Sequence, residues 1–128
     1  MDKIERLQKI IDEANNIVFF GGAGVSTDSG IKDFRGENGL YKENLDVEPE
    51  YLLSIRCFSN EPDRFFAFYK SAMNGVNALP NTTHKYLKKL EDRGVLKAII
   101  TQNIDGLHQK AGSKKVYEIH GSIYQNTA

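Results

Sequence analysis

Hydrophobic positions follow two different spacings in the first twenty residues. Apolar side chains recur every three or four residues from Ile4 to Ala14, which is typical of an amphipathic helix, and we expect that helix to end near Asn15 and Asn16. The next four residues, 17–20, are all apolar. A short continuous apolar run of this kind predicts a buried strand of a parallel sheet.

The middle of the chain reads as helical. Pro62 stands where the first turn of a helix would begin, and proline is favoured at that position because its missing N–H needs no partner there. The predicted helix continues into an aromatic segment that contains Phe65, Phe66, Phe68 and Tyr69. A second helix is expected from His84 to Arg93, capped by Asn81 or Thr82 and closed by Gly94.

Two further strands complete the pattern. They are predicted over Val95–Thr101 and Lys115–Ile119, with a glycine-containing segment between them. Strands that alternate with helices favour an α/β fold with a mainly parallel sheet. Ligands of such sheets usually bind at the carboxyl ends of the strands, so the loops after the three strands are the first places to search for chemistry.

The loop after the first strand is rich in glycine. Gly22, Ala23 and Gly24 allow a tight turn whose N–H groups approach an anion, and Ser26 and Thr27 add hydroxyl donors at an expected helix N-terminus. The dinucleotide fingerprint G-x-G-x-x-G is half met, because Thr27 stands where its third glycine belongs. A phosphate site and a glycine-rich turn without a ligand therefore both remain open on this segment alone.

Polar residues also follow the other strands and the glycine loop. Asp33, Phe34 and Arg35 place an acid, a ring and a guanidinium side by side, which suits a phosphate or carboxylate as well as an internal ion pair in a solvated loop. Gln102, Asn103 and Asp105 follow the second strand and are suited to orienting a ribose. His120 follows the third strand and is suited to proton transfer near neutral pH, although a lone histidine is more often structural.

The remaining candidates are read as structural or left open. His84 lies among lysines and is expected at the surface, whereas a structural and a functional role for His108 stay equally open. Cys57 is the only cysteine, so no internal disulfide forms, and we expect this side chain to be packed.

Charge and composition exclude some partners. Lysine plus arginine and aspartate plus glutamate number 17 each, so no overall field favours nucleic acid or an anionic membrane, and neither is expected as a partner. The N-terminal region alternates charged and apolar residues without a long apolar run. We therefore expect a cytoplasmic protein with one globular domain or part of one.

Three segments, in this order and spacing, resemble the sirtuins, which are NAD-dependent protein lysine deacylases: GAGVSTDSGIKDFRG, TQNIDGLHQKAG and EIHGS. The resemblance covers essentially the whole chain. It implies a Rossmann-like parallel sheet with flanking helices, incomplete here because residues 1–128 would correspond to the N-terminal half of the sirtuin NAD-binding fold. It also implies that the zinc module and the second half of that fold are absent from these residues.

The same resemblance implies a role for each candidate residue. Gly22, Ala23, Gly24 and Ser26 would receive the NAD pyrophosphate, and the segment Asp33-Phe34-Arg35 would surround the nicotinamide pocket. Gln102, Asn103, Ile104 and Asp105 would hold the ribose and nicotinamide. His120 would be the catalytic base, with Gln102 and Asn103 also in the catalytic set.

The implied reaction transfers an acetyl group from lysine to ADP-ribose and releases nicotinamide, with acetylated lysine proteins as substrates. No protein nucleophile is required. Relatives that prefer acidic acyl groups resemble Tyr-x-x-Arg in a segment where this chain has Tyr69 and Ala72. These two residues are therefore assigned to the acyl pocket, and neutral acyl groups are expected to be favoured.

The chain also departs from the family pattern. Lys32 stands where the family nearly always has proline, and Ala128 stands where the first zinc-binding cysteine would be, so zinc is expected for the family but its ligands are missing here. An inactive fragment that binds NAD, another nucleotide or a partner is therefore the alternative function. Whether these 128 residues turn over substrate alone stays open.

Overall fold

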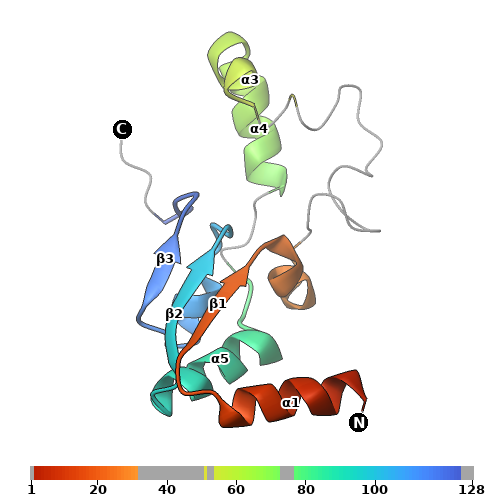
Figure 1. Cartoon of the computed structure of the whole chain (residues 1–128). Coiled ribbons are helices and arrows are strands. Elements are labelled where there is room, and N and C mark those ends of the chain that lie inside the picture. The colour runs from red at the N-terminus through yellow and green to blue at the C-terminus, as the bar shows by residue number, and fades with distance from the viewer. Residues whose placement is uncertain (1, 32–50, 52–53, 73–76, 125–128) are drawn as a thin grey trace. The chain divides into compact units, whose positions relative to one another are not determined.

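The computed structural model describes residues 2–31, 51, 54–72 and 77–124 (Figure 1). The chain divides into two compact units, Met1–Gly22 with Pro80–Ala128 and Ala23–Leu79, which we describe separately as the sheet unit and the helical unit. The sheet unit contains the helices α1 (Lys3–Glu13), α5 (Thr82–Asp92) and α6 (Leu107–Lys110) and the strands β1 (Ile17–Gly21), β2 (Leu96–Thr101) and β3 (Val116–Glu118). The helical unit contains η1 (Ala23–Ser29), α3 (Ile55–Asn60) and α4 (Pro62–Ala72).

The three described strands form one parallel sheet in the order β1-β2-β3. Phe19 pairs with Ile99 and Ile99 with Val116, while the next row is Phe20, Ile100 and Tyr117. All three strands therefore end at the same edge. The sequence prediction of an α/β fold with a parallel sheet is confirmed, and each strand lies within one residue of its predicted range at either end.

The hydrophobic core lies between one face of the sheet and α5. Its buried members are Leu87 and Leu90 from α5 and Leu96 and Ile99 from β2. Partly buried residues from β1, β3, α5, the end of α1 and the turn before β2 pack around them: Ile11, Ile17, Phe19, Tyr86, Val95 and Val116. Burial of these apolar side chains is the main stabilising contribution to the sheet unit.

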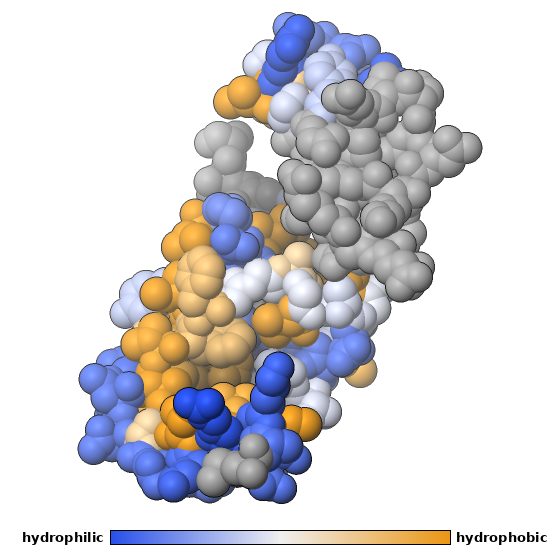
Figure 2. All heavy atoms as spheres, turned by 45° about the vertical axis from the view of Figure 1, so that its right-hand side comes forward, coloured by the Kyte–Doolittle hydropathy of each residue, from blue (hydrophilic) through white to orange (hydrophobic). Residues whose placement is uncertain are grey.

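The opposite face of the sheet is exposed. Val18, Phe20 and Tyr117 keep 56%, 60% and 57% of their surface accessible, and Figure 2 shows hydrophobic residues gathered over the strands. The prediction that residues 17–20 form a strand buried on both sides is therefore wrong for every second residue. The reason is that side chains of a strand point alternately to opposite faces, and α5 covers one face only.

The apolar stripe of α1 is also largely exposed. The predicted helix forms over Lys3–Glu13, and Asp2 caps it by accepting a hydrogen bond from the Glu5 N–H at 2.7 Å. Ile4 nevertheless remains 80% exposed, and no residue of the helix is fully buried. The helix is thus amphipathic as predicted, but only its C-terminal end, at Ile11, packs against the core.

Capping defines both ends of α5. Asn81 is the N-cap and accepts hydrogen bonds from the backbone N–H groups of Thr83 and His84, at 2.9 and 3.4 Å. Gly94 follows the C-cap with φ of +80°, the left-handed backbone that favours glycine after a helix. The helix therefore begins at Thr82, two residues before the predicted start, while its predicted end is correct to within one residue.

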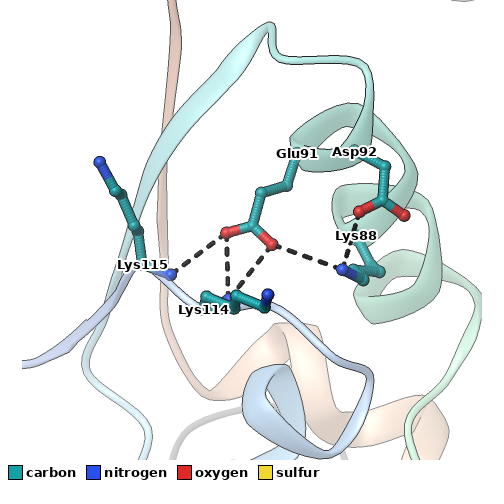
Figure 3. Close-up of polar contacts among 5 residues, drawn as sticks. All are labelled: Lys88, Glu91, Asp92, Lys114 and Lys115. Atoms are coloured by element: carbon teal, nitrogen blue, oxygen red, sulfur yellow. Dashed lines mark hydrogen bonds and ion pairs between the residues drawn. The ribbon is translucent and has the colours of Figure 1, made fainter.

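A charged cluster on α5 holds the turn before β3 (Figure 3). The Glu91 carboxylate accepts hydrogen bonds from the backbone N–H groups of Lys114 and Lys115, at 3.0 and 3.1 Å. Lys88 lies between the two acids of the helix, 2.7 Å from Asp92 and 3.9 Å from Glu91. One side chain thus satisfies two backbone donors, and the start of β3 is tied to α5.

The helical unit has a small aromatic cluster. Phe58 of α3 makes edge-to-face contacts with Phe65 and Phe66 of α4, with ring centroids 5.3 and 5.8 Å apart. Cys57 is fully buried, as predicted. Pro62 begins α4 as predicted, whereas α3, whose N-cap is Ser54, was not anticipated from the sequence.

Candidate functional site at the carboxyl ends of the strands

The loops after β1 and β2 are joined by two hydrogen bonds. The backbone N–H of Gln102 donates to the carbonyl of Gly21 at 3.0 Å, which extends the ladder beyond β2. The side-chain amide of Asn103 donates to the carbonyl of Gly22 at 2.9 Å. Two of the predicted site residues, 81 positions apart in the sequence, are therefore in direct contact at the carboxyl edge of the sheet.

Gly22 and Gln102 lie so close that a larger residue would disturb them. A Cβ atom at position 22 would stand 2.7 Å from Oε1 of Gln102, which is closer than real carbon atoms approach an oxygen. Because this oxygen is the far end of an exposed, flexible side chain, a residue with a Cβ atom at position 22 would displace the Gln102 amide from its present place.

The loop from Gln102 to Asp105 is held from within. The Asn103 N–H donates to the hydroxyl of Thr101 at 2.9 Å, and the Asp105 carboxylate accepts the N–H of Leu107 at 3.0 Å. The carbonyl of Ile104 accepts the N–H of Ile123 at 3.0 Å, so the segment after His120 is bound to the same loop. Asn103 and Asp105 are both nearly buried.

His120 reaches this loop from β3. One of its ring nitrogens, Nδ1, lies 3.0 Å from the carbonyl oxygen of Gln102. A carbonyl can only accept, so Nδ1 carries the proton and Nε2 is the basic nitrogen of the neutral ring. The imidazole is exposed, which leaves it open to a substrate. Gly22, Gln102, Asn103, Ile104, Asp105 and His120 are thus brought together in the sheet unit.

The other predicted residues of the glycine loop belong to the helical unit. Ala23 and Gly24 begin η1, and Ser26 lies inside it and is almost completely buried. Thr27 donates its hydroxyl proton to the Gly24 carbonyl at 3.0 Å. The expectation that Ser26 and Thr27 stand at the start of a helix is therefore wrong, because the helix begins at Ala23, three residues before Ser26, and is a 3₁₀ helix.

Gly24 differs from Gly22 in its surroundings. A Cβ atom there would meet nothing within 4 Å, and Gly24 is not among the glycines with positive φ. Neither packing nor backbone conformation within the described residues requires a glycine at this position. The open space is the kind that an approaching ligand would use.

Some predicted residues lie at the limits of the described structure. Asp33, Phe34 and Arg35, and Lys32 before them, lie outside the described residues. Tyr69 is half-buried on α4, where its ring stacks on Phe65 with centroids 6.1 Å apart. Ala72 ends α4, but its side chain is outside the described set.

The described part of the chain offers no obvious metal centre or membrane span. No group of three or more His, Cys, Asp or Glu side chains in it is arranged to hold a metal ion, so the zinc implied by the family resemblance has no ligand set among these residues. None of the described helices is both long and apolar enough to cross a bilayer.

Sequence reasoning misjudged one histidine and left the role of another open. His84, expected at the surface, is completely buried, and His108 is 1% exposed. The signal for His84 was present, because it shares a helical stripe with Leu87 and Leu90, but the lysines between them obscured it. Thr101 was also missed as the acceptor that fixes the Asn103 backbone.

Comparison with known sequences identifies close relatives. NAD-dependent protein deacetylases from Clostridium acetobutylicum and Clostridium perfringens are each 58% identical to the chain, over 128 and 127 residues. Each alignment covers 98% of this chain but 52% of the relative. The chain thus spans about half the length of these relatives.

Solved structures of Sir2 proteins are also similar to this chain. A Sir2 protein with a deacetylated p53 peptide and 3'-O-acetyl ADP-ribose matches with a TM-score of 0.85 and 42% identity, over 95% of this chain and 48% of that one. A Sir2 complex with p53 peptide and NAD+ matches with a TM-score of 0.78 and 41% identity, over 95% and 47%. The model of the Sir2 family matches residues 22–128. The chain therefore belongs to the Sir2 family.

Proposed function

We propose that this chain carries part of the catalytic site of an NAD-dependent protein lysine deacetylase, which transfers an acetyl group from lysine to ADP-ribose with release of nicotinamide. The observation that carries the proposal is the contact of His120 with the Gln102 carbonyl, beside the bond from Asn103 to Gly22. Residues from three loops thereby meet at the edge of the sheet where α/β proteins bind ligands. The names of the relatives support the same activity.

His120 is proposed as the general base. Its Nδ1 proton is held by the Gln102 carbonyl, so Nε2 is available to take a proton from a ribose hydroxyl of the bound substrate. Gln102 and Asn103 complete the catalytic set. Gln102 orients the imidazole through its backbone carbonyl, and the side-chain amide of Asn103 is held in place by the Gly22 carbonyl.

The glycine loop is proposed to bind the NAD pyrophosphate through Gly22, Ala23, Gly24 and Ser26. The open space at Gly24 fits this role, because phosphate oxygens accept hydrogen bonds from a backbone that no side chain shields. When bound, NAD supplies the ADP-ribose acceptor and the nicotinamide leaving group. Gln102, Asn103, Ile104 and Asp105 are proposed to orient the ribose and nicotinamide, and Asp33, Phe34 and Arg35 to surround the latter.

Acetylated lysine proteins are proposed as the substrates. A solved Sir2 relative is described with a p53 peptide and NAD+. Tyr69 and Ala72 are proposed to line the acyl pocket, where the absence of an arginine favours acetyl and other neutral groups over acidic ones. The cytoplasmic location expected from the sequence stays a prediction.

The proposal is tested by replacing the base in the protein that contains this chain. His120→Ala should lower the turnover of an acetyl-lysine peptide by roughly 10²- to 10⁴-fold, because a positioned base contributes about that much, while calorimetric titration shows NAD affinity nearly unchanged. Lys85→Ala, an exposed change on α5, is the matched control and should have no effect. Unaltered turnover in His120→Ala would remove the base assignment. NAD binding without turnover in the unmodified protein would favour the alternative of a non-catalytic binding fragment.

A further inference from the structure

Thr101, the last residue of β2, lies between the ends of the other two described strands. β2 is the middle strand of the sheet, and Thr101 stands in register with Gly21 of β1 on one side and Glu118 of β3 on the other. Its carbonyl accepts the N–H of Ile119 at 3.1 Å, so the residue directly before His120 is bound to it. Thr101 therefore adjoins both the strand end that leads into the glycine loop and the strand end that leads to His120.

The side chain of Thr101 is directed to the loop that follows β2. The residue is 2% exposed, and its hydroxyl oxygen accepts the N–H of Asn103 at 2.9 Å. The side-chain amide of Asn103 in turn donates to the Gly22 carbonyl at 2.9 Å. Two hydrogen bonds therefore connect a buried hydroxyl, through Asn103, to the start of the glycine loop.

Strand packing does not explain a hydroxyl at this position. Valine matches threonine in shape and also favours strands, so β2 could end on valine without loss of propensity. A buried hydroxyl lowers stability unless it forms a hydrogen bond, and the N–H of Asn103 supplies that bond. The difference between threonine and valine at position 101 therefore acts on the loop, and not on the strand.

We infer that Thr101 is a positioning residue, whose hydroxyl fixes the backbone of Asn103 and thereby holds the amide of that residue against the Gly22 carbonyl, in the geometry that receives the cofactor. The inference rests on the proposed NAD site. Because Thr101 is buried, it acts through Asn103 and not by contact with substrate. A group that orients a reacting molecule is effective only when a supporting side chain fixes its place, which is the part that this hydroxyl takes.

Two substitutions at position 101 separate the hydroxyl from the shape of the side chain. In the protein that contains this chain, Thr101→Val should lower kcat for an acetyl-lysine peptide by roughly tenfold, because the acceptor that fixes Asn103 is lost. KM for the peptide should stay nearly unchanged, since Asn103 is proposed to orient the ribose and nicotinamide. Thr101→Ser keeps the hydroxyl and should keep kcat, although the lost methyl group lowers its melting temperature. Thr83→Val, the same change at an exposed position of α5, is the matched control and should alter neither constant.

Amide hydrogen exchange gives a readout that needs no turnover. The N–H of Asn103 should exchange faster in Thr101→Val than in the unmodified protein, because a hydrogen bond that protects it is removed, whereas Thr101→Ser should keep the protection. If Thr101→Val does not fold, Thr101→Ser and Thr101→Ala make the same comparison, because they differ by the hydroxyl alone.

The outcomes separate positioning from a structural role. A loss of kcat that follows the hydroxyl and not the melting temperature supports the inference. Unchanged kcat in Thr101→Val, or an equal loss of kcat in Thr101→Ser, would overturn it. Absence of both NAD binding and turnover in the unmodified protein would count against the proposed function itself. The exchange of the Asn103 amide then decides alone: faster exchange in Thr101→Val supports the role of the hydroxyl, and unchanged exchange overturns it.

Discussion

The two faces of the sheet differ sharply, although the same strands build both. On one face, Phe19, Ile99 and Val116 stand in register and pack against the core under α5. One residue further along, Phe20, Ile100 and Tyr117 form an equally apolar row on the other face, where the two outer residues are more than half exposed. Hydropathy is thus similar on the two faces, and coverage distinguishes them.

The sequence of a strand shows which residues favour burial, whereas the described structure shows which of them are covered. Continuous apolar runs such as residues 17–20 are typical of strands that are covered on both sides. Within the described residues of the sheet unit, one face of the sheet is covered, by α5. The covered face supplies the stability of this unit, while the exposed face has the composition of a surface that packs against something.

The largest expected effect comes from testing the two faces with the same substitution. Ile99→Ala should lower the free energy of unfolding by about 2–5 kcal/mol, because it leaves a cavity at a fully buried position. Ile100→Ala on the adjacent position should cost about 1 kcal/mol, since it loses mainly strand propensity and a partly buried surface. Urea denaturation of the two variants measures the difference, and both share the same propensity loss. Equal costs would show that the two faces are covered alike.

Acid should act on the covered side, where the buried rings of His84 and His108 pack against each other. His108 has a pKa of about 4 in the folded chain and 6.5 when unfolded, so between these values the unfolded chain binds a proton that the folded chain does not. The neutral His108 ring therefore contributes fully to the free energy of unfolding above pH 6.5. About 3 kcal/mol of that free energy is lost as the pH falls from 7 to 4. His84 shifts in the same direction, and Asp105 is the acid that acts on both rings.

A comparison with His108→Phe separates the contribution of His108 to the pH dependence of stability from that of the carboxylates, which also titrate. Denaturation at pH 7 and pH 4 should show a smaller loss of stability in the variant than in the unmodified protein. Parallel losses in both proteins would mean that His108 keeps its ordinary pKa on folding, and that the covered side is no more sensitive to acid than the rest of the molecule.

Local signals in the sequence predicted much of this architecture. Asn81, Gly94 and Pro62 mark helix ends through short-range chemistry that does not depend on the rest of the fold. The contact of Asn103 with Gly22 could only be expected in outline, because the carboxyl ends of parallel strands meet at one edge but the partner of each side chain depends on register.

The failures have a different cause. His84 was expected at the surface because its neighbours are charged, yet burial follows the helical stripe and not the nearest residues. The exposure of Phe20 could not be foreseen, because hydropathy records which residues favour burial and not whether a second layer is present. The assignment of site residues therefore came from motif order and spacing, and their geometry came from the sheet.

The smallest effect on stability is expected on the exposed face, and it sharpens the comparison. Tyr117→Thr keeps a residue that favours strands but removes an exposed ring, so the free energy of unfolding should change by less than about 0.5 kcal/mol. The binding of a hydrophobic dye should fall at the same time, and any self-association seen by sedimentation should weaken. Val116→Thr, the adjacent change on the covered face, is the matched control and should cost about 1–3 kcal/mol because it brings a hydroxyl into the core contact. If Tyr117→Thr destabilises the protein as much as Val116→Thr does, then the second face is covered in solution, and the contrast between the two rows of side chains does not hold.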